Sequence, residues 1–223
     1  MFHINISMLY EPLLSLPKIP DNLVQILLDD FEFNRPRLVP TKDNFEKFKM
    51  LPEYKGKVDN EHENPDTLEG QLGVFTSMAQ SIYNKEICNF NMMSVTSPTV
   101  LEWLRDNLPF DSIHAGMQEF VNGVFFPPHV DLVRYRAINY AIDLGGDNVT
   151  TDFWQPTPQF ANLAITPRTS MPYERIEKIG SYKVELNKWH QLDVTKIHSV
   201  ENIDPSKRRF SLTLSRFNIP LTS

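Results

Sequence analysis

The sequence predicts a mainly β fold of the α+β kind, in which a sandwich or barrel-like β-roll follows an N-terminal helical cap. From about Met117 onward, apolar residues alternate along the chain with a strand-like period, and β-branched and aromatic residues are frequent. Turn sequences such as Gly145–Asn148 and Asp204–Lys207 separate these short segments. In the first half of the chain, by contrast, apolar residues recur at helical spacing.

The length of 223 residues predicts one domain, with a helical and loop cap over residues 1–114 and a β core over residues 115–223. Two helices are predicted in the cap, Asp21–Asp30 and Pro98–Leu108, because each carries a single apolar stripe. Thr67–Lys85 is predicted to hold a further helix or helical turn, and the segment up to Pro20 to lie extended against the body. The polar stretch Lys55–Asp66 has no apolar stripe, so we expect a loop there.

The core is predicted to consist of short strands that are rich in β-branched and aromatic residues. The predicted strands are Ala115–Val121, Ala137–Asp143, Thr150–Gln155, Phe160–Thr166, Tyr182–Leu186, Trp189–Asp193, Ile197–Asn202 and Arg209–Phe217. Many short strands separated by turns are typical of a sandwich or a barrel.

Composition limits the classes of function. The formal net charge of −6 argues against a broad nucleic-acid-binding surface. A single cysteine, Cys88, excludes an internal disulfide framework and fits a reducing compartment. The N-terminus lacks the pattern of a signal peptide, and no apolar run approaches the roughly 20 residues that span a bilayer. We therefore expect a cytoplasmic protein without a membrane partner.

Three side chains of metal-ligating type stand out in the core, namely His129, Asp131 and His198. One residue separates His129 from Asp131, so in an extended segment both side chains point to one side and can reach the same ion. Two imidazoles and one carboxylate are the facial triad of non-haem Fe(II) oxygenases. In the alternative interpretation, His129 is a loop residue, Asp131 caps a turn, and His198 is a half-buried strand residue.

The motifs around these residues resemble those of the Fe(II)/2-oxoglutarate-dependent oxygenase superfamily. The segment PHVDLVRYRAINYAI resembles its aspartyl/asparaginyl β-hydroxylase-like branch, with a prolyl-hydroxylase-like branch as the alternative. A tryptophan-led strand at Trp189–Asp193, the distal His198, and Arg-x-Ser at Arg209 and Ser211 match the C-terminal signature. The resemblance covers about residues 117–217 and implies a double-stranded β-helix, the jelly-roll or cupin-like fold.

The resemblance also implies an activity. His129, Asp131 and His198 would be the catalytic residues and would bind Fe(II), with 2-oxoglutarate as cosubstrate and O2 as oxidant. The implied reaction is hydroxylation, with release of succinate and CO2. The substrate is expected to be a small molecule or a peptide, and the sequence predicts no oligomeric state.

The same resemblance implies contacts with 2-oxoglutarate. Strand alternation places Arg209 and Ser211 on one face and Arg208 on the other, and a guanidinium binds a carboxylate bidentately. Arg209 with Ser211 is therefore our choice for the distal carboxylate, with Arg208 as the alternative. Asn139 is expected near the other carboxylate, and Arg134 is expected to orient the metal-binding carboxylate or to bind substrate. A surface salt bridge or a strand-edge hydrogen bond is the other interpretation of these last two residues.

Other polar and aromatic residues of the core receive structural interpretations. His190 is predicted to be structural or to lie at the edge of the cosubstrate site, not to bind metal. Tyr140 and Trp154 are predicted to belong to the core, with a pocket position as the alternative. We also expect Lys55–Asp66 or the turn Gly145–Asn148 to form a lid over the substrate.

A second class of function is a cupin-like metal-binding module, or an isomerase, without oxygenase turnover. Such proteins usually have a richer histidine set, often with a glutamate, and they do not need Arg-x-Ser. A degenerate fold used for protein interaction is a third class, and the intact set of metal-ligating residues argues against it.

Overall fold

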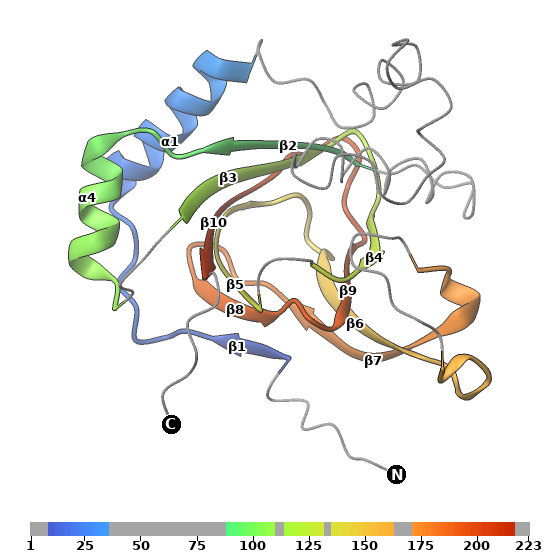
Figure 1. Cartoon of the computed structure of the whole chain (residues 1–223). Coiled ribbons are helices and arrows are strands. Elements are labelled where there is room, and N and C mark those ends of the chain that lie inside the picture. Colours follow the sequence, from blue (N-terminus) through green and yellow to red (C-terminus); the bar gives the residue numbers. More distant parts are fainter. Residues whose placement is uncertain (1–8, 36–87, 110–113, 132–134, 163–170, 217–223) are drawn as a thin grey trace, which may run out of the picture.

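The computed structural model describes residues 9–35, 88–109, 114–131, 135–162 and 171–216. Within these ranges the chain forms helices, short 3-10 helices and two antiparallel sheets (Figure 1). The helices are α1 (Asp21–Asn34) and α4 (Pro98–Asn107), and the 3-10 helices are η4 (Pro158–Phe160) and η5 (Tyr173–Arg175). The strands are β1 (Tyr10–Pro12), β2 (Asn89–Ser94), β3 (His114–Val121), β4 (Phe126–His129), β5 (Arg136–Leu144), β6 (Thr150–Pro156), β7 (Ile176–Lys183), β8 (Trp189–Asp193), β9 (Ile197–Glu201) and β10 (Arg209–Arg216).

The two sheets have the strand order of a jelly roll. One sheet has the order β1-β8-β5-β10-β3-β2 and the other has the order β4-β9-β6-β7. With β3 counted as the first strand and β10 as the eighth, one sheet contains the order first, eighth, third, sixth. The other sheet has the order second, seventh, fourth, fifth. This interleaving of strands is that of the double-stranded β-helix, so the predicted fold class is confirmed.

Helices α1 and α4 cover the outer face of the six-stranded sheet, at the left of Figure 1. In α1, Leu23, Leu27 and Phe31 are buried at every fourth position, which places them on one face of the helix. Phe31 meets Phe210 of β10 edge-on, with ring centroids 4.9 Å apart. Both predicted helices are confirmed, and α1 extends beyond its predicted end.

Strand β10 separates two environments. Its apolar residues pack toward the helices, and these residues are Phe210, Leu212 and Leu214. The intervening buried polar residues point between the two sheets, and these residues are Arg209, Ser211 and Thr213. The face assignment made from the sequence is therefore confirmed, and the space between the sheets carries buried polar groups.

Most of the predicted strands agree with the structure to within a residue or two, and Trp189–Asp193 is β8 as predicted. The strand predicted at Phe160–Thr166 is wrong where the structure describes it, because Phe160 ends η4 and a turn follows. Prolines at the end of β6 and the start of η4 lack the N–H that a sheet ladder needs. Residues 163–170 lie outside the described part of the chain.

The strand predicted at Tyr182–Leu186 begins earlier and ends earlier, as β7. The chain leaves the sheet after Lys183, and Asn187 has a φ of 56°, which a continuing strand does not allow. Strands β1, β2 and β4 were not among the predicted strands, although β1 lies in the segment predicted to be extended.

The division into a cap and a core stays a prediction. Strands β1 and β2 come from the first part of the chain, yet both are edge strands of the six-stranded sheet. The predicted helix Thr67–Lys85 and the predicted loop Lys55–Asp66 lie outside the described residues. None of the helices within the described ranges is both long enough and apolar enough to cross a membrane.

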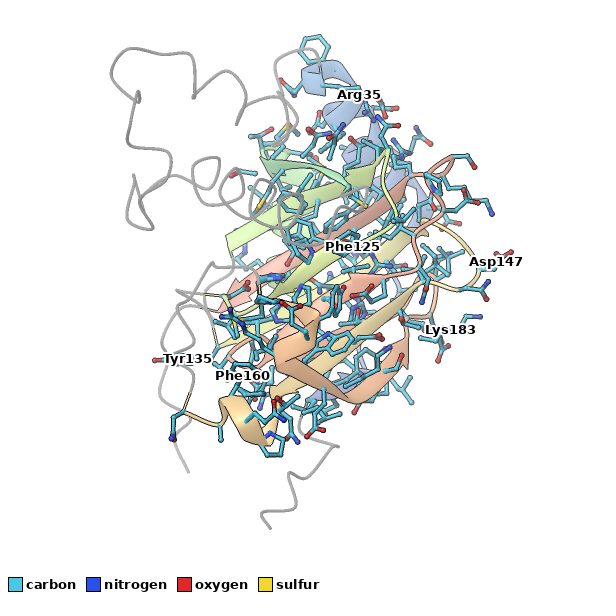
Figure 2. The ribbon with its side chains drawn as sticks, turned by 90° about the vertical axis from the view of Figure 1, so that its right-hand side faces the viewer. Arg35, Phe125, Tyr135, Asp147, Phe160 and Lys183 are labelled. Atoms are coloured by element: carbon cyan, nitrogen blue, oxygen red, sulfur yellow. The ribbon has the colours of Figure 1, made fainter. Side chains whose placement is uncertain are left out.

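A charged network fastens the end of α1 to the sheet. The Glu119 carboxylate on β3 is fully buried and accepts hydrogen bonds from Arg35 Nη1 at 2.9 Å and Nη2 at 2.5 Å. Asn91 Nδ2 donates a third hydrogen bond at 2.8 Å. Arg35, labelled at the top of Figure 2, also bonds Glu32, and Arg208 donates to Glu32 at 2.6 Å. Arg208 therefore lies on the helix-covered side of the sheet, where it contacts α1, and does not reach the space between the sheets.

Candidate metal centre

Two histidines face each other across neighbouring strands at the centre of this site. His129 is the last residue of β4, and its Cα partner across the ladder is His198 of β9. Their ring centroids lie 4.3 Å apart, with an angle of 48° between the ring planes. Both side chains are buried, at 8% and 6% exposure. The antiparallel pairing of β4 with β9 therefore brings together two residues that lie far apart in the sequence.

Each imidazole is oriented by a carbonyl two residues earlier in the chain. His129 Nδ1 lies 2.7 Å from the Pro127 carbonyl oxygen, and His198 Nδ1 lies 2.9 Å from the Lys196 carbonyl oxygen. A carbonyl oxygen only accepts, so in each ring Nδ1 donates the hydrogen bond. In a neutral ring Nε2 then carries the lone pair, which is the arrangement that metal-binding histidines use.

Asp131, two residues after His129, completes the cluster. Its Oδ1 lies 3.4 Å from His129 Nε2, and its backbone N–H donates to the Val194 carbonyl at 3.0 Å. One ligand atom from each of Asp131, His129 and His198 lies within 4.8 Å of the others. The structure thus brings together the three residues that the sequence analysis selected as metal ligands.

Aromatic side chains surround the two imidazoles. Phe126 meets the His129 ring at a right angle, with centroids 5.1 Å apart, and Phe153 lies 6.2 Å from the His198 ring. Both phenylalanines are buried. An apolar wall holds the rings in place, and it lowers the local dielectric constant around an ion at this position.

The donor set fits a divalent transition metal. Two imidazole nitrogens and one carboxylate oxygen on one side of an ion leave its other positions for small ligands. The described cluster contains no thiolate ligand, and Cys88 belongs instead to an apolar group of the core. A purely carboxylate and carbonyl site of the kind preferred by Ca²⁺ or Mg²⁺ does not match two imidazoles.

Arg209 carries a buried positive charge between the sheets. It is 6% exposed, and burial lowers the pKa of its guanidinium to about 10. Its Nη1 donates to the Leu144 carbonyl at 3.3 Å. Within the described ranges no carboxylate forms an ion pair with this guanidinium, whereas the neighbouring Arg208 pairs with Glu32.

Other predicted cosubstrate contacts lie on the same inner face. Ser211 and Thr213 follow Arg209 on β10, and Asn139 of β5 is the Cα partner of Thr213. The Asn139 Oδ1 atom is buried without a hydrogen-bond partner among the described atoms. The structure therefore brings these residues together on neighbouring strands, while Arg134 lies outside the described residues.

The metal-ligand cluster lies nearer the Tyr135 end of β5, and Arg209 lies nearer its Leu144 end. Tyr135 appears at one edge of Figure 2 and the turn after β5 at the opposite edge. Val194 N–H donates to the Tyr135 carbonyl at 3.2 Å and Val194 O accepts from Asp131 N–H, which ties the cluster to the Tyr135 end. Arg209 pairs with Leu144 at the other end of β5. A ligand that touches both groups would lie along the inner face of β5.

His190, predicted to be structural or to lie at the edge of the cosubstrate site, is 2% exposed and lies on the inner face of β8. Its burial follows from pairing with β1, which the local sequence does not reveal. Tyr140 belongs to the core beneath the helices, and the half-buried Trp154 packs in a second apolar group with Tyr173. Neither aromatic residue lines the space between the histidines.

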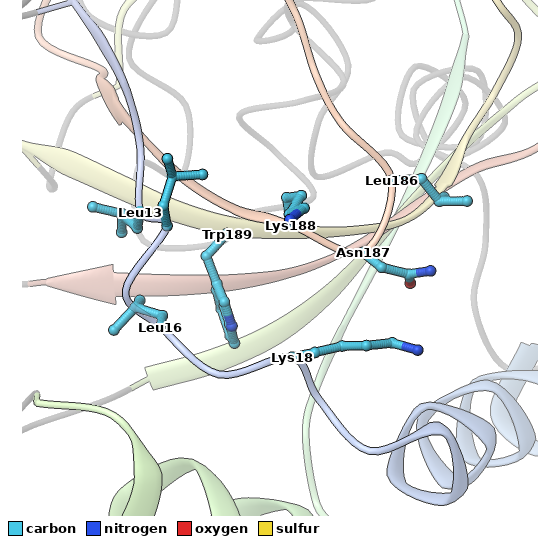
Figure 3. A pocket seen from close by; sticks show the side chains of 8 residues that line it. Leu13, Leu16, Lys18, Leu186, Asn187, Lys188 and Trp189 are labelled. Atoms are coloured by element: carbon cyan, nitrogen blue, oxygen red, sulfur yellow. The ribbon is translucent and has the colours of Figure 1, made fainter.

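A separate cavity of about 260 Å³ lies on the outside of the barrel (Figure 3). Its lining comes from the segment before α1 and from the connection between β7 and β8. The lining residues are Leu13, Leu14, Leu16, Lys18, Leu186, Asn187, Lys188 and Trp189. None of the three clustered metal-ligand residues contributes to this cavity.

No protein-family model matches the chain, and no curated protein matches it. Its fold is similar to a solved oxidoreductase of the 2OG-Fe(II) oxygenase family from Burkholderia pseudomallei, at 11% identity and a TM-score of 0.38, over 57% of this chain and 67% of that one. A Pseudomonas putida prolyl-4-hydroxylase is similar at 10% identity and a TM-score of 0.45, over 95% and 94% of the two chains. A cupin-like protein from Thermotoga maritima is similar at 9% identity and a TM-score of 0.30, over 60% and 72%. At these identities the likeness concerns the fold alone.

Proposed function

We propose that this protein is an Fe(II)- and 2-oxoglutarate-dependent dioxygenase that hydroxylates a small molecule or a peptide. One observation carries the proposal. A cluster of the buried His129 and His198 with the partly buried Asp131 shares the inside of one barrel with Arg209, a buried cation without a carboxylate partner among the described residues. A metal-binding group and an anion-binding group in one barrel match a ligand that is both a chelator and a dicarboxylate.

The proposed role of the cluster is to hold Fe(II) on one side. The Nδ1 hydrogen bonds of His129 and His198 leave Nε2 of each ring available, so these two atoms and one carboxylate oxygen of Asp131 would hold the ion. When bound, the iron supplies activation of O2 coupled to oxidative decarboxylation of 2-oxoglutarate, which releases succinate and CO2 and leaves a hydroxyl on the substrate. The protein contributes binding, orientation and the exclusion of water.

The proposed role of Arg209 is to hold the distal carboxylate of 2-oxoglutarate. A planar guanidinium donates two parallel hydrogen bonds to a carboxylate, and a buried cation is stabilised when an anion joins it. Ser211 on the same strand face provides a hydroxyl donor beside it. Asn139 is proposed to contact the other carboxylate, and Arg134 is proposed to orient Asp131 or to bind substrate.

The walls of the barrel would protect the reaction from water. Phe126 and Phe153 flank the two histidines, and both are buried. Such walls strengthen the electrostatic interactions inside the site and limit side reactions. The identity of the substrate, a cytoplasmic location and the absence of nucleic-acid and membrane partners stay proposals drawn from the sequence.

Turnover with and without the metal tests the proposal. Protein supplied with Fe(II), O2 and 2-oxoglutarate should form succinate, first without substrate and then faster with a peptide or metabolite that fits. His198→Ala should reduce succinate to the level of metal-free protein. If the wild-type protein binds Fe(II) but forms no more succinate than His198→Ala under any of these conditions, a cupin-like module without oxygenase turnover becomes the better interpretation.

A further inference from the structure

His190 is a buried side chain whose polar atoms lack partners in the described structure. It is 2% exposed, and neither Nδ1 nor Nε2 has a hydrogen-bond partner among the described atoms. The Lys188 backbone lies near the ring and raises its pKa, but it forms no hydrogen bond of normal geometry with either nitrogen. Leaving a buried donor or acceptor unpaired costs about 1–3 kcal/mol, so an unpaired imidazole calls for an explanation.

The ring is neutral in this environment. Burial and, to a smaller extent, the positive charge of Arg209 lower the pKa of His190 to about 3. A neutral imidazole offers one N–H donor and one lone pair. Tyr10, whose ring stacks on His190, also lies close enough to Arg209 for each charge to affect the pKa of the other group.

Polar side chains connect His190 across the inner face of the sheet to β10, the strand that carries Arg209. On β5 the Cα partner of His190 is Asn139, and the partner of Asn139 on β10 is Thr213. Two buried alanines, Ala137 and Ala141, flank Asn139 on the same face of β5. The inner face therefore presents polar side chains separated by small ones, as expected where a polar ligand approaches the sheet.

Tyrosine rings hold the imidazole in one orientation. Tyr10 of β1 stacks on His190 with centroids 5.5 Å apart and an angle of 25° between the ring planes. Tyr10 also stacks on Tyr182 of β7, with ring centroids 4.9 Å apart and an angle of 14° between the ring planes. The stack joins the edges of the two sheets, so His190 cannot turn away without disturbing both.

We propose that His190 is a specificity-determining residue, whose neutral imidazole donates a second hydrogen bond to the distal carboxylate held by Arg209. This inference rests on the proposed function and adds a residue to its cosubstrate site. One cation and one neutral donor match the single charge of a carboxylate, whereas a second cation would leave an excess charge buried. A site that is built to bond a polar group rejects a ligand that lacks the group, because its own buried donors then stay unpaired.

Paired ligands separate this role from a general effect on the fold. The full-length protein is loaded with Zn(II), which is not redox-active, and is titrated by calorimetry with 2-oxoglutarate and with 2-oxopentanoate. The two ligands share the chelating end, and only 2-oxoglutarate has the distal carboxylate. His190→Leu should weaken 2-oxoglutarate binding roughly tenfold or more and leave 2-oxopentanoate binding unchanged.

Donor-keeping variants and a direct signal complete the test. His190→Gln or His190→Asn should restore part of the lost affinity, because a side-chain amide replaces the N–H at one of the two ring positions. In the wild-type protein, 2-oxoglutarate should shift the nitrogen NMR resonances of the His190 ring, and 2-oxopentanoate should shift them much less. The NMR measurement does not depend on how well any variant folds.

The contrary outcomes are distinct. Equal weakening of both ligands by His190→Leu, or unchanged His190 resonances on 2-oxoglutarate binding, would show that the residue is only structural and would leave the proposed function intact. A wild-type protein that binds Zn(II) but neither 2-oxo acid would overturn the proposed function and this inference together.

Discussion

His129 and His198 are direct partners across the β4–β9 ladder, and their ring centroids lie 4.3 Å apart. Side chains of directly opposed residues on an antiparallel pair lie on the same face, so the register alone places the two imidazoles beside each other. A slip of one residue would send one histidine to the other face of the sheet. The strand register is therefore the structural feature on which the metal centre depends.

Arg209 and Arg208 should differ in their effect on cosubstrate binding. Arg209→Ala should raise the Kd for 2-oxoglutarate roughly tenfold or more, because the bound carboxylate loses a bidentate cation in a buried site. Arg208→Ala should change this Kd little, because Arg208 pairs with Glu32 on the outer layer. Calorimetric titration of Zn(II)-loaded protein measures both, and the opposite ranking would show that the two faces of β10 are wrongly assigned.

Gly145 should be intolerant of a side chain. Its φ is +73°, and an added Cβ would lie 2.6 Å from Arg209 Cβ, so Gly145→Ala both strains the turn and pushes on Arg209. We expect a loss of roughly 2 kcal/mol or more in the free energy of unfolding, together with weaker 2-oxoglutarate binding.

Gly146→Ala is the matched control for Gly145. Gly146 also has a positive φ, but its nearest contact is Asp204 Cβ at 3.2 Å and Arg209 is not among its nearest neighbours. It should lower stability without changing 2-oxoglutarate affinity in the folded fraction. Gly145 O also accepts a hydrogen bond from Asp204 N–H at 2.9 Å, and these contacts favour a fixed turn over the lid predicted at Gly145–Asn148.

Arg35 should contribute to stability through the buried Glu119. Arg35→Ala removes two hydrogen bonds from a fully buried carboxylate and leaves Asn91 and the more distant Arg208. We expect a loss of roughly 2 kcal/mol, below the ~3–5 kcal/mol of a fully buried pair, because the Arg35 side chain is 36% exposed. Arg105→Ala removes a 69% exposed partner and should cost less than about 0.5 kcal/mol. Urea unfolding of both variants measures these losses. Equal losses of stability would contradict a stabilising role of Arg35 through the buried Glu119.

His190 should make the protein less stable in acid. Its pKa is lowered to about 3 in the folded state, whereas an unfolded histidine has a pKa of about 6.5, so the unfolded state binds the extra proton between these values. The contribution of the neutral His190 to the free energy of unfolding should therefore be complete above about pH 6.5. As the pH falls below about 6.5, this contribution should decrease by at most about 1.4 kcal/mol per pH unit. When the free energy of unfolding is measured by urea titration at a series of pH values, it should depend less steeply on pH in His190→Gln than in the wild type. Identical slopes would mean that the ring is not held neutral.

The sequence was sufficient where a local pattern decides the structure. The alternation in β10 separates Arg209 from Phe210, and the i, i+2 spacing of His129 and Asp131 places them on one side of an extended segment. Strand β4 escaped prediction because Pro127 and Pro128 lack N–H groups and suppress the strand signal. The sheet tolerates them because β4 is an edge strand.

Other features depend on contacts between distant parts of the chain. His190 is buried because Tyr10 stacks on it from β1, a strand of three residues that no local pattern identifies. The lack of a carboxylate partner for Arg209 among the described residues is likewise a property of the whole inner face, and no single segment reveals it. Side-chain alternation is readable from sequence, while the partner of each side chain is set by tertiary packing.

Anaerobic titration of the protein with Fe(II) and then 2-oxoglutarate tests the central claim most directly. The account predicts about one equivalent of bound Fe(II), because one cluster of His129, Asp131 and His198 occurs within the described residues. Addition of 2-oxoglutarate should then produce a visible charge-transfer absorption, which should be absent in His198→Ala and should need more 2-oxoglutarate in Arg209→Ala. Fe(II) bound equally well by His129→Ala and His198→Ala, or a wild-type spectrum that 2-oxoglutarate leaves unchanged, would contradict the account.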